Sequence, residues 1–477
     1  MKSQSANHTD KDHLGRTIGV GFLVALVFAA LAHGAVEPWS VFVFEAIIVI
    51  LVLLWVVKVL LDKRLNLTIP NIGLPIAALI AIGIAQSVAF TDSTGRWLSL
   101  SKNVGFTRAA VTVLIFLFIS FLIASNFFKS KVRLQVLAHF LVLYGLAMAL
   151  FALVQHFTWN GRFYWLRATE VTSPFGPFAN HNHFAGYMAL LIPLPIALIV
   201  SRAVPREMRV LYGFAATMMG IAAVLSLSRG GMISIVAGMV FLVVMSVRLP
   251  RPEKTIVKRR FPRFASQAAV VIAILAVISA GIYWIGADPL INRVTRGQLT
   301  SEDPLKETFF SSRGWIWRDT ISMIGANPLL GVGLGAYETA FSIYSKSDGS
   351  LRVPQAHNDY LQVVADCGIV GGLIALWFII LVFRSIARGT RSRDPLYSGL
   401  ALGCGAGIFA ILVHSLFDFN LQLPANALLF LVLTAVAAQI GATVTEEQAS
   451  TLDVSRRTAI QPTTRSVSLA GVGKGAS

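Results

Sequence analysis

Long runs of apolar residues alternate with short polar connections along most of the chain. The runs lie at about 17–36, 39–61, 71–90, 107–127, 134–156, 183–201, 209–227, 230–248, 265–286, 367–386, 397–416 and 424–442. A helix needs about 20 consecutive apolar residues to cross a bilayer. The pattern therefore predicts an all-α polytopic membrane protein with about 12 transmembrane helices.

The apolar runs divide the chain into five segments. We expect a cytoplasmic N-terminus at 1–16, helices 1 to 9 within 17–286, a loop at 287–366, helices 10 to 12 within 367–442 and a disordered cytoplasmic tail at 443–477. The tail is rich in Ser, Thr, Gly and Ala and has no apolar period. The first apolar run is long for a signal peptide and is followed at once by a second run, so we expect it to be retained as a helix.

The composition agrees with a membrane protein and explains the net charge. Only 13% of the 477 residues are charged, whereas a soluble domain carries about 25%. The net charge of +17 could indicate a nucleic-acid partner, but most of the Lys and Arg residues gather in alternate connections. Cytoplasmic loops collect Lys and Arg. We therefore expect both termini in the cytoplasm, anionic membrane lipid as a secondary partner, and no nucleic acid.

The connection at 287–366 is far longer than the others and would lie outside the cytoplasm. Insertions of this length usually have their own structure and carry function. Trp317, Ile321 and Ile324 recur at helical spacing, which predicts an amphipathic helix. Asn327-Pro328 would end that helix. The loop is therefore the first place to look for chemistry.

Two arginine motifs could act at the external face. Arg229 lies in SLSRGG (226–231), where it could face a ligand or snorkel to the interface as a helix cap. Arg313 and Arg318 lie in RGWIWR (313–318), where two guanidinium groups at a helix start could grip a phosphate. The alternative for this pair is that both are solvated while the tryptophans pack at the membrane interface.

Two further polar motifs contain histidine. His357 begins HNDYLQ (357–362), directly before the tenth apolar run. Histidine is readily used as a general base near neutral pH, and Asn358 or Asp359 could hold its tautomer; a surface histidine is the alternative. Asn180, His181, Asn182 and His183 form a second group, but His residues at i and i+2 point to different faces of a helix. We expect a polar helix entrance there and no metal site.

Other signals argue against a metal or a cofactor. The Asp-x-Asp pair with which membrane glycosyltransferases commonly hold a divalent cation occurs only at Asp10 and Asp12, in the N-terminal segment. GVGLG (331–335) is similar to a phosphate-binding fingerprint, but it follows no clear strand and would lie outside the cytoplasm, so we reject a nucleotide site. The two cysteines are expected to be buried. We predict no metal and no cofactor.

Together the motifs resemble those of the O-antigen ligase and polymerase superfamily. SLSRGG, SRGWIW with NPLLGVGLG, AHNDYLQ with GIVG, and PFANHNHF (177–184) cover about 170–385. The resemblance implies a GT-C-like fold in the bacterial inner membrane and glycan transfer at the periplasmic face from an undecaprenyl-diphosphate donor. Ligases transfer to lipid A–core, polymerases to another lipid-linked glycan, and other relatives to protein Ser or Thr. The resemblance carries roles onto Arg229, Arg313 and His357, and its acidic position appears here as Asp366.

We therefore predict a metal-independent, inverting glycosyltransferase of the O-antigen ligase type. Arg229 and Arg313 would stabilise the diphosphate leaving group and His357 would deprotonate the acceptor hydroxyl. Substrate binding is assigned to Asn358, Arg318, Asn180 and Asn182. The alternatives are a polysaccharide polymerase of the same superfamily and, from another class, a 12-helix polysaccharide transporter. A transporter would show internal repeats and midplane ionisable residues, and the sequence has no such repeat and few such residues.

Overall fold

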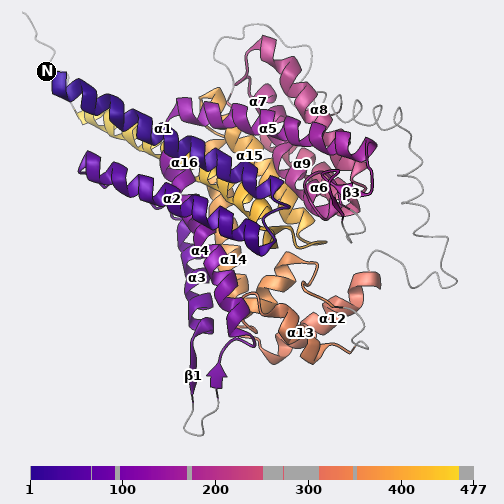
Figure 1. Cartoon of the computed structure of the whole chain (residues 1–477). Coiled ribbons are helices and arrows are strands. Elements are labelled where there is room, and N and C mark those ends of the chain that lie inside the picture. The colour runs from indigo at the N-terminus through magenta and orange to yellow at the C-terminus, as the bar shows by residue number, and fades with distance from the viewer. Residues whose placement is uncertain are drawn as a thin grey trace, which may run out of the picture.

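The computed structural model describes residues 2–65, 67–91, 97–168, 174–250, 272, 311–346 and 352–460. These residues form a bundle of long helices with a smaller helical unit, α12 and α13, at one end (Figure 1). The strands of the described part form two short antiparallel hairpins, β1 (Ala89–Thr91) with β2 (Trp97–Ser99) and β3 (Arg162–Phe163) with β4 (Arg167–Ala168).

The helices follow the predicted apolar runs. Their bounds are α1 Lys2–Leu31, α2 Pro38–Asp62, α3 Gly73–Ser87, α4 Val104–Phe127, α5 Lys131–Phe157, α6 His181–Leu191, α7 Pro193–Val200, α8 Arg209–Leu225, α9 Arg229–Ser246, α12 Ser311–Ala326, α13 Tyr337–Tyr344, α14 Asp359–Gly389, α15 Pro395–His414 and α16 Pro424–Ile460. Two short 3₁₀ turns, η1 (Arg206–Met208) and η2 (Asn420–Gln422), join some of them.

The structure confirms an all-α polytopic membrane fold. Ten helical segments of the described residues are long and apolar enough to cross a membrane, and α3, with 15 residues, is a shorter apolar helix. The predicted run at 265–286 lies outside the described residues, apart from residue 272. The predicted total of about 12 spans is therefore checked only in the described part of the chain.

Three boundaries differ from the prediction. The run at 183–201 is divided into α6 and α7 because Pro193 and Pro195 interrupt the helical hydrogen bonds. The tenth run is preceded by a short helix that begins at Asp359 and is capped by Asn358, and Gly368, with non-helical φ 68° and ψ −170°, separates this short helix from the long one, so the predicted start at 367 lies at the break. The tail predicted to be disordered from residue 443 is helical to Ile460, since 443–460 contains no glycine or proline.

The centre of the bundle is formed by α6, α7, α15 and α16. The apolar window is 89% buried in α6–α7, 78% in α15 and 83% in α16, against 22% in α2 and 17% in α14. Small residues allow the central helices to approach closely. A Cβ atom added at Gly407 of α15, for example, would lie 2.3 Å from the carbonyl oxygen of Leu190. Because the apolar windows of α2 and α14 are mostly exposed, these peripheral helices present apolar surface to the membrane.

The connections gather at the two ends of the bundle. At one end, Lys131 pairs with Asp394, which joins the connections that the charge pattern assigns to the cytoplasm. At the opposite end, the Gln86 side chain donates to the Leu330 carbonyl at 2.6 Å, and the Ala425 N–H donates to the Gly34 carbonyl at 3.2 Å. Connections that the charge pattern assigns to opposite sides of the membrane therefore lie at opposite ends of the bundle.

The helix predicted in the long loop is present as α12. Its buried face is formed by Ile316, Thr320 and Met323, whereas Ile321, which the periodicity placed on the apolar face, is 59% exposed. Asn327 ends the helix and donates its side-chain amide to the carbonyl of Met323. The loop therefore contains the predicted helix, but the buried face of this helix is rotated relative to the predicted apolar face.

The glycine-rich segment that follows attaches the loop to the bundle. The N–H groups of Val332 and Gly333 donate to the carbonyls of Ala365 and Asp366 at 2.9 and 3.0 Å, and Lys102 N–H donates to the Val332 carbonyl at 2.8 Å. A Cβ atom at Gly331, whose φ is +70°, would lie 2.5 Å from the Ala365 carbonyl oxygen. Glycine at this position thus permits the close backbone approach that anchors the loop on α14.

Candidate active site

A buried carboxylate lies in the short connection between α15 and α16. Asp418 is 1% exposed. The connection turns tightly after α15, since the Phe417 and Asp418 N–H groups both donate to the His414 carbonyl. Asp418 Oδ1 also accepts from the Phe419 N–H at 2.9 Å. A buried ionised group needs charged or hydrogen-bonding partners, and the partners of Asp418 come from the long loop.

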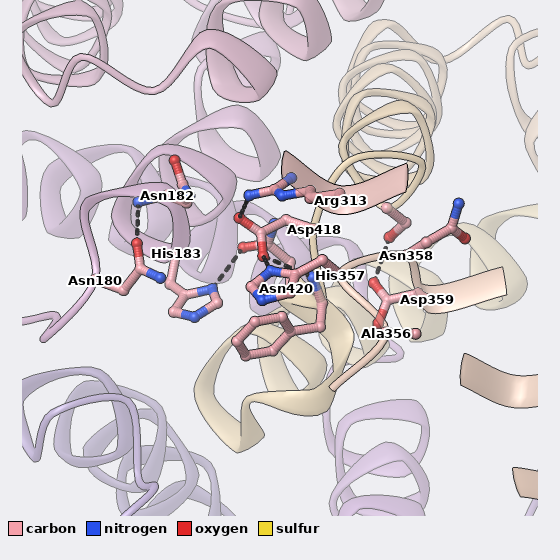
Figure 2. Close-up of polar contacts among 12 residues, drawn as sticks. Asn180, Asn182, His183, Arg313, Ala356, His357, Asn358, Asp359, Asp418 and Asn420 are labelled. Atoms are coloured by element: carbon pink, nitrogen blue, oxygen red, sulfur yellow. Dashed lines mark hydrogen bonds and ion pairs between the residues drawn. The ribbon is translucent and has the colours of Figure 1, made fainter. Parts of the chain in front are cut away.

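His357 and Arg313 approach the Asp418 carboxylate from two sides (Figure 2). His357 Nδ1 lies 3.5 Å from Oδ1, and Arg313 Nη2 lies 3.9 Å from Oδ2. Burial by itself would raise the pKa of Asp418, but the His357 contact and the charges of His183, His414 and Arg313 hold it well below its ordinary value. The carboxylate is therefore a fixed negative charge between the two predicted catalytic groups.

The segment that contains His357 is hydrogen-bonded to the Asp418 connection at several points. Asn358 caps α14 by accepting from the Tyr360 and Leu361 N–H groups, and its side-chain nitrogen donates to the Leu416 carbonyl at 3.1 Å. The Asp359 N–H donates to the Ser415 carbonyl at 2.9 Å, and the Ser415 hydroxyl donates to Asp359 Oδ2 at 2.6 Å. His357 itself has φ 51°, a conformation uncommon outside glycine. Its position is thus set by its neighbours on both sides.

Arg313 is positioned by the first turn of α12. Trp317, one turn further along that helix, donates its indole N–H to the Ala356 carbonyl at 3.0 Å, directly beside His357. Arg318 lies elsewhere: its Nε donates to Asp319 Oδ1 at 2.9 Å, and its side chain is 61% exposed. The two arginines of this motif therefore have different surroundings, and Arg313 alone contacts Asp418.

The start of α6 lies on another side of the same connection. Asn180 caps α6 by accepting from the Asn182 N–H at 2.9 Å. His183 Nδ1 lies 3.4 Å from Asn420 Oδ1. The Phe419 ring contacts both His183, at 4.8 Å between ring centres, and His357, at 4.9 Å. The polar helix entrance expected here therefore adjoins the Asp418 cluster, defined as Arg313, His357, Asp418 and, behind Phe419, His183 and Asn420.

The first turn of α9 brings Arg229 to the same end of the bundle. Ser228 caps this helix by accepting from the Gly231 N–H at 3.1 Å. A Cβ atom at Gly230 would lie 3.0 Å from the His414 ring and 3.5 Å from the Phe417 Cβ atom. The helix start that carries Arg229 is thus packed against the turn that carries Asp418.

Asp366 does not join this cluster. Its Oδ2 atom accepts from the Gln362 side chain at 3.3 Å and from the Gly335 N–H at 3.2 Å. It therefore belongs to the attachment of the glycine-rich segment to α14, and the acidic partner of His357 is Asp418. Among the described residues, no group of three or more His, Cys, Asp or Glu could hold a metal ion.

The comparisons with known proteins give one family match. The family model described as O-Antigen ligase matches residues 214–378, which include Arg229, Arg313 and His357. This match supports the resemblance of the chain to the O-antigen ligase superfamily. A search of curated proteins finds no match.

Three residues of the site lie outside the segment that the O-antigen ligase model matches and were missed by the sequence reasoning: His183, Asp418 and Asn420. His183 was predicted only as part of a polar helix entrance. The other two lie in the connection of nine residues between α15 and α16, in the sequence SLFDFNLQL (415–423). An aspartate in so short an external connection is the signal that could have revealed them.

Proposed function

We propose that this protein transfers a glycan from an undecaprenyl-diphosphate donor to an acceptor hydroxyl at the periplasmic face of the bacterial inner membrane. The acceptor proposed is lipid A–core. The observation that carries the proposal is the buried carboxylate of Asp418 in contact with both His357 and Arg313. This arrangement combines a base with a cation, which are the two groups that displacement of a diphosphate needs.

The base in this reaction is His357. Its Nδ1 atom faces Asp418, so Nε2 is the nitrogen that accepts the proton of the acceptor hydroxyl. The negative charge of Asp418 stabilises the imidazolium that forms and holds the ring in one orientation, as a carboxylate does for the histidine of a catalytic triad. A correctly placed general base contributes about 10²–10⁴-fold to a rate.

The cations act on the leaving group. The acceptor oxygen forms a bond to the anomeric carbon of the donor sugar as the bond from that carbon to the diphosphate oxygen breaks, and the electron pair leaves with undecaprenyl diphosphate. Arg229 and Arg313 stabilise the charge that develops on this diphosphate. A single direct displacement inverts the anomeric centre, and the proposed reaction has no step that uses a metal.

The hydrogen bonds and ion pairs of the four predicted substrate-binding residues refine the roles that we propose for them. Both polar atoms of the Asn358 side chain are used to cap α14 and to bind Leu416, so its proposed role is to position His357. Asn180 and Asn182 lie beside His183 at the α6 entrance and remain proposed substrate ligands. Arg318, paired with Asp319, is proposed to meet substrate only at the outer surface of α12.

Reconstituted transfer tests the function directly. The purified chain, an undecaprenyl-diphosphate-linked glycan and lipid A–core are expected to give glycosylated lipid A–core, and to do so in EDTA. A second reaction contains the lipid-linked glycan alone. Elongation of the lipid-linked glycan without modification of lipid A–core would establish a polymerase, and absence of any transfer by folded protein would contradict the proposal.

The proposed orientation is tested by cysteine labelling in intact cells. Leu166 and Glu207 are exposed at opposite ends of the bundle, and both native cysteines are buried. Basic connections stay in the cytoplasm, so a membrane-impermeant maleimide should label Leu166→Cys in intact cells and Glu207→Cys only after permeabilisation. Labelling of Glu207→Cys in intact cells would place the Asp418 cluster in the cytoplasm.

A further inference from the structure

A second surface rich in aromatic groups lies at the same end of the bundle as the Asp418 cluster. It is formed by His33, Trp39, Phe151, Tyr164 and Trp165, here named the aromatic platform. The His33 and Phe151 rings lie 5.5 and 5.4 Å from the Tyr164 ring, and Phe151 lies 6.0 Å from Trp165. The platform combines the α1–α2 connection, the start of α2, α5 and the β3–β4 hairpin. None of these residues has a part in the proposed chemistry.

The backbone of the platform is strained. Tyr164 and Trp165 are consecutive residues with φ of 52° and 61°, and His33 and Ala35 have φ of 59° and 56°. These are four of the eight non-glycine residues with positive φ in the described part of the chain. Bulky residues rarely adopt this conformation, and such strain gathers at active sites and ligand clamps. Aromatic side chains occupy positions where glycine or asparagine would fit the turn better.

The strained residues are fixed in place by specific contacts. The Tyr164 hydroxyl donates to the Leu31 carbonyl at 2.5 Å, which ties the hairpin to the end of α1. The Trp165 indole N–H donates to the Thr158 carbonyl and hydroxyl at 3.0 and 2.9 Å. Trp and Tyr are also enriched at membrane–water interfaces. Here the rings contact one another across separate connections and form a preorganised surface.

An ion pair forms the polar rim of the platform. Arg167 Nη1 lies 2.8 Å from Glu37 Oε1, and the Trp39 indole N–H donates to Glu37 Oε2 at 2.6 Å. The hydrogen bond from Trp39, together with Arg167, lowers the pKa of Glu37, so the carboxylate is ionised at neutral pH. The Arg167 side chain is 59% exposed and Trp39 is 49% exposed. Charged donors and acceptors therefore stand beside accessible ring surface.

This combination fits the chemistry of a sugar ring. A pyranose has a face of C–H groups, which pack on aromatic rings, and a rim of hydroxyl groups, which bond well to carboxylate and guanidinium groups. We propose that the aromatic platform, with Glu37 and Arg167, is a binding site for an oligosaccharide. The inference rests on the proposed function, and the oligosaccharide is either the donor glycan or the sugar part of the acceptor.

The position of the platform next to the reaction site favours a sugar over a lipid headgroup. Gly34, in the platform's α1–α2 connection, accepts from the Ala425 N–H, seven residues after Asp418. A Cβ atom at Gly34 would also lie 3.3 Å from Leu423 and 3.3 Å from Phe178, just before the α6 entrance. A glycan held on the platform would therefore continue toward the Asp418 cluster.

Substitution of Trp165 by glycine gives the sharpest test. Glycine accepts the positive φ of this turn without strain, so Trp165→Gly removes the ring while keeping a backbone that suits the hairpin. Glu37→Gln is a second variant that keeps the size of the side chain and removes its charge. The matched control is Trp377→Ala, which removes a 40% exposed tryptophan from the membrane-spanning part of α14.

Binding is measured by saturation-transfer NMR on the full chain in detergent. The probes are a delipidated core oligosaccharide and the polysaccharide released from its lipid diphosphate by mild acid. We expect one probe to bind the wild type and the Trp377→Ala variant equally, and the Kd to rise about tenfold in Trp165→Gly, as loss of one aromatic contact would produce. The probe that binds identifies the platform as the acceptor or the donor side.

The results that would contradict the proposed oligosaccharide site differ from those that would contradict the proposed transferase activity. Binding of neither sugar by a wild-type chain that transfers glycan, or equal sugar binding by Trp165→Gly, would overturn the platform alone. If Trp165→Gly changed only the binding of sugar-free anionic phospholipid vesicles, the aromatic platform would instead be a membrane-binding surface. Sugar binding by a folded chain that transfers no glycan would overturn the proposed function and leave the platform standing.

Discussion

His357→Asn should reduce the rate of glycan transfer about 10²–10⁴-fold, which is the usual contribution of a general base, while donor affinity stays close to that of the wild type. Asparagine tolerates the left-handed backbone at this position, where φ is 51°, and its amide can still donate to Asp418. It cannot accept a proton from the acceptor hydroxyl. The variant therefore removes the proton acceptor while it keeps the backbone conformation and the contact with Asp418.

The measurement is turnover and donor binding on one folded preparation of His357→Asn. His139→Asn is the matched control, because His139 is partly buried beside Tyr212 near the opposite end of the bundle. Weakened donor binding would make His357 a ligand of the diphosphate, and increased proteolysis of the loop would make it a packing residue. Normal turnover would contradict the assignment of His357 as the base.

The membrane helices could be predicted from sequence because each span is a local property. The run at 107–127 needs only its own apolar residues to be recognised, and α4 confirms it. Boundaries were predicted less well where a polar cap or a proline acts within an apolar run. Asn358 starts a short helix at Asp359, ahead of the break at Gly368, because its side chain accepts from two backbone N–H groups that hydropathy does not register.

The centre of the site could not be predicted in the same way. Asp418 becomes significant only because α12 and the start of α14 fold back onto the α15–α16 connection, more than 50 residues away in the chain from His357. The resemblance to a family pointed to Asp366 as the acidic residue, since it follows His357 closely in sequence. Asp366 instead bonds to the Gly335 N–H. Proximity along the chain was a poor guide to proximity in space.

Asp418→Asn should abolish most transfer even though Asp418 contacts neither the sugar nor the diphosphate in the proposed reaction. The amide keeps the shape of the side chain but removes the charge that faces His357 and Arg313. Replacing the carboxylate that orients a catalytic histidine reduces turnover by up to about 10⁴-fold. The loss should appear in kcat, with donor affinity less affected, and should equal that of His357→Asn if the two residues act as one unit.

The same substitution should lower stability in a defined pH range. Because the pKa of Asp418 is lowered in the folded chain, its ionised form contributes stability above its ordinary pKa of about 3.9, and this contribution is lost only as pH falls through the lowered value. Asp418→Asn should therefore be less stable than the wild type by about 1–3 kcal/mol. This difference should be present from about pH 5 to about pH 8, as checked by thermal unfolding in detergent.

Asp394→Asn is the matched control for Asp418→Asn. Asp394 also pairs with a cation, Lys131, but it caps α15 at the opposite end of the bundle, and asparagine caps helices as well as aspartate does. This control should transfer glycan at the wild-type rate. If Asp418→Asn also does so while remaining folded, His357 does not need a carboxylate, and the proposed base must act without the contact on which this mechanism depends. Equal loss in both variants would instead show that the assay reports general damage to the bundle.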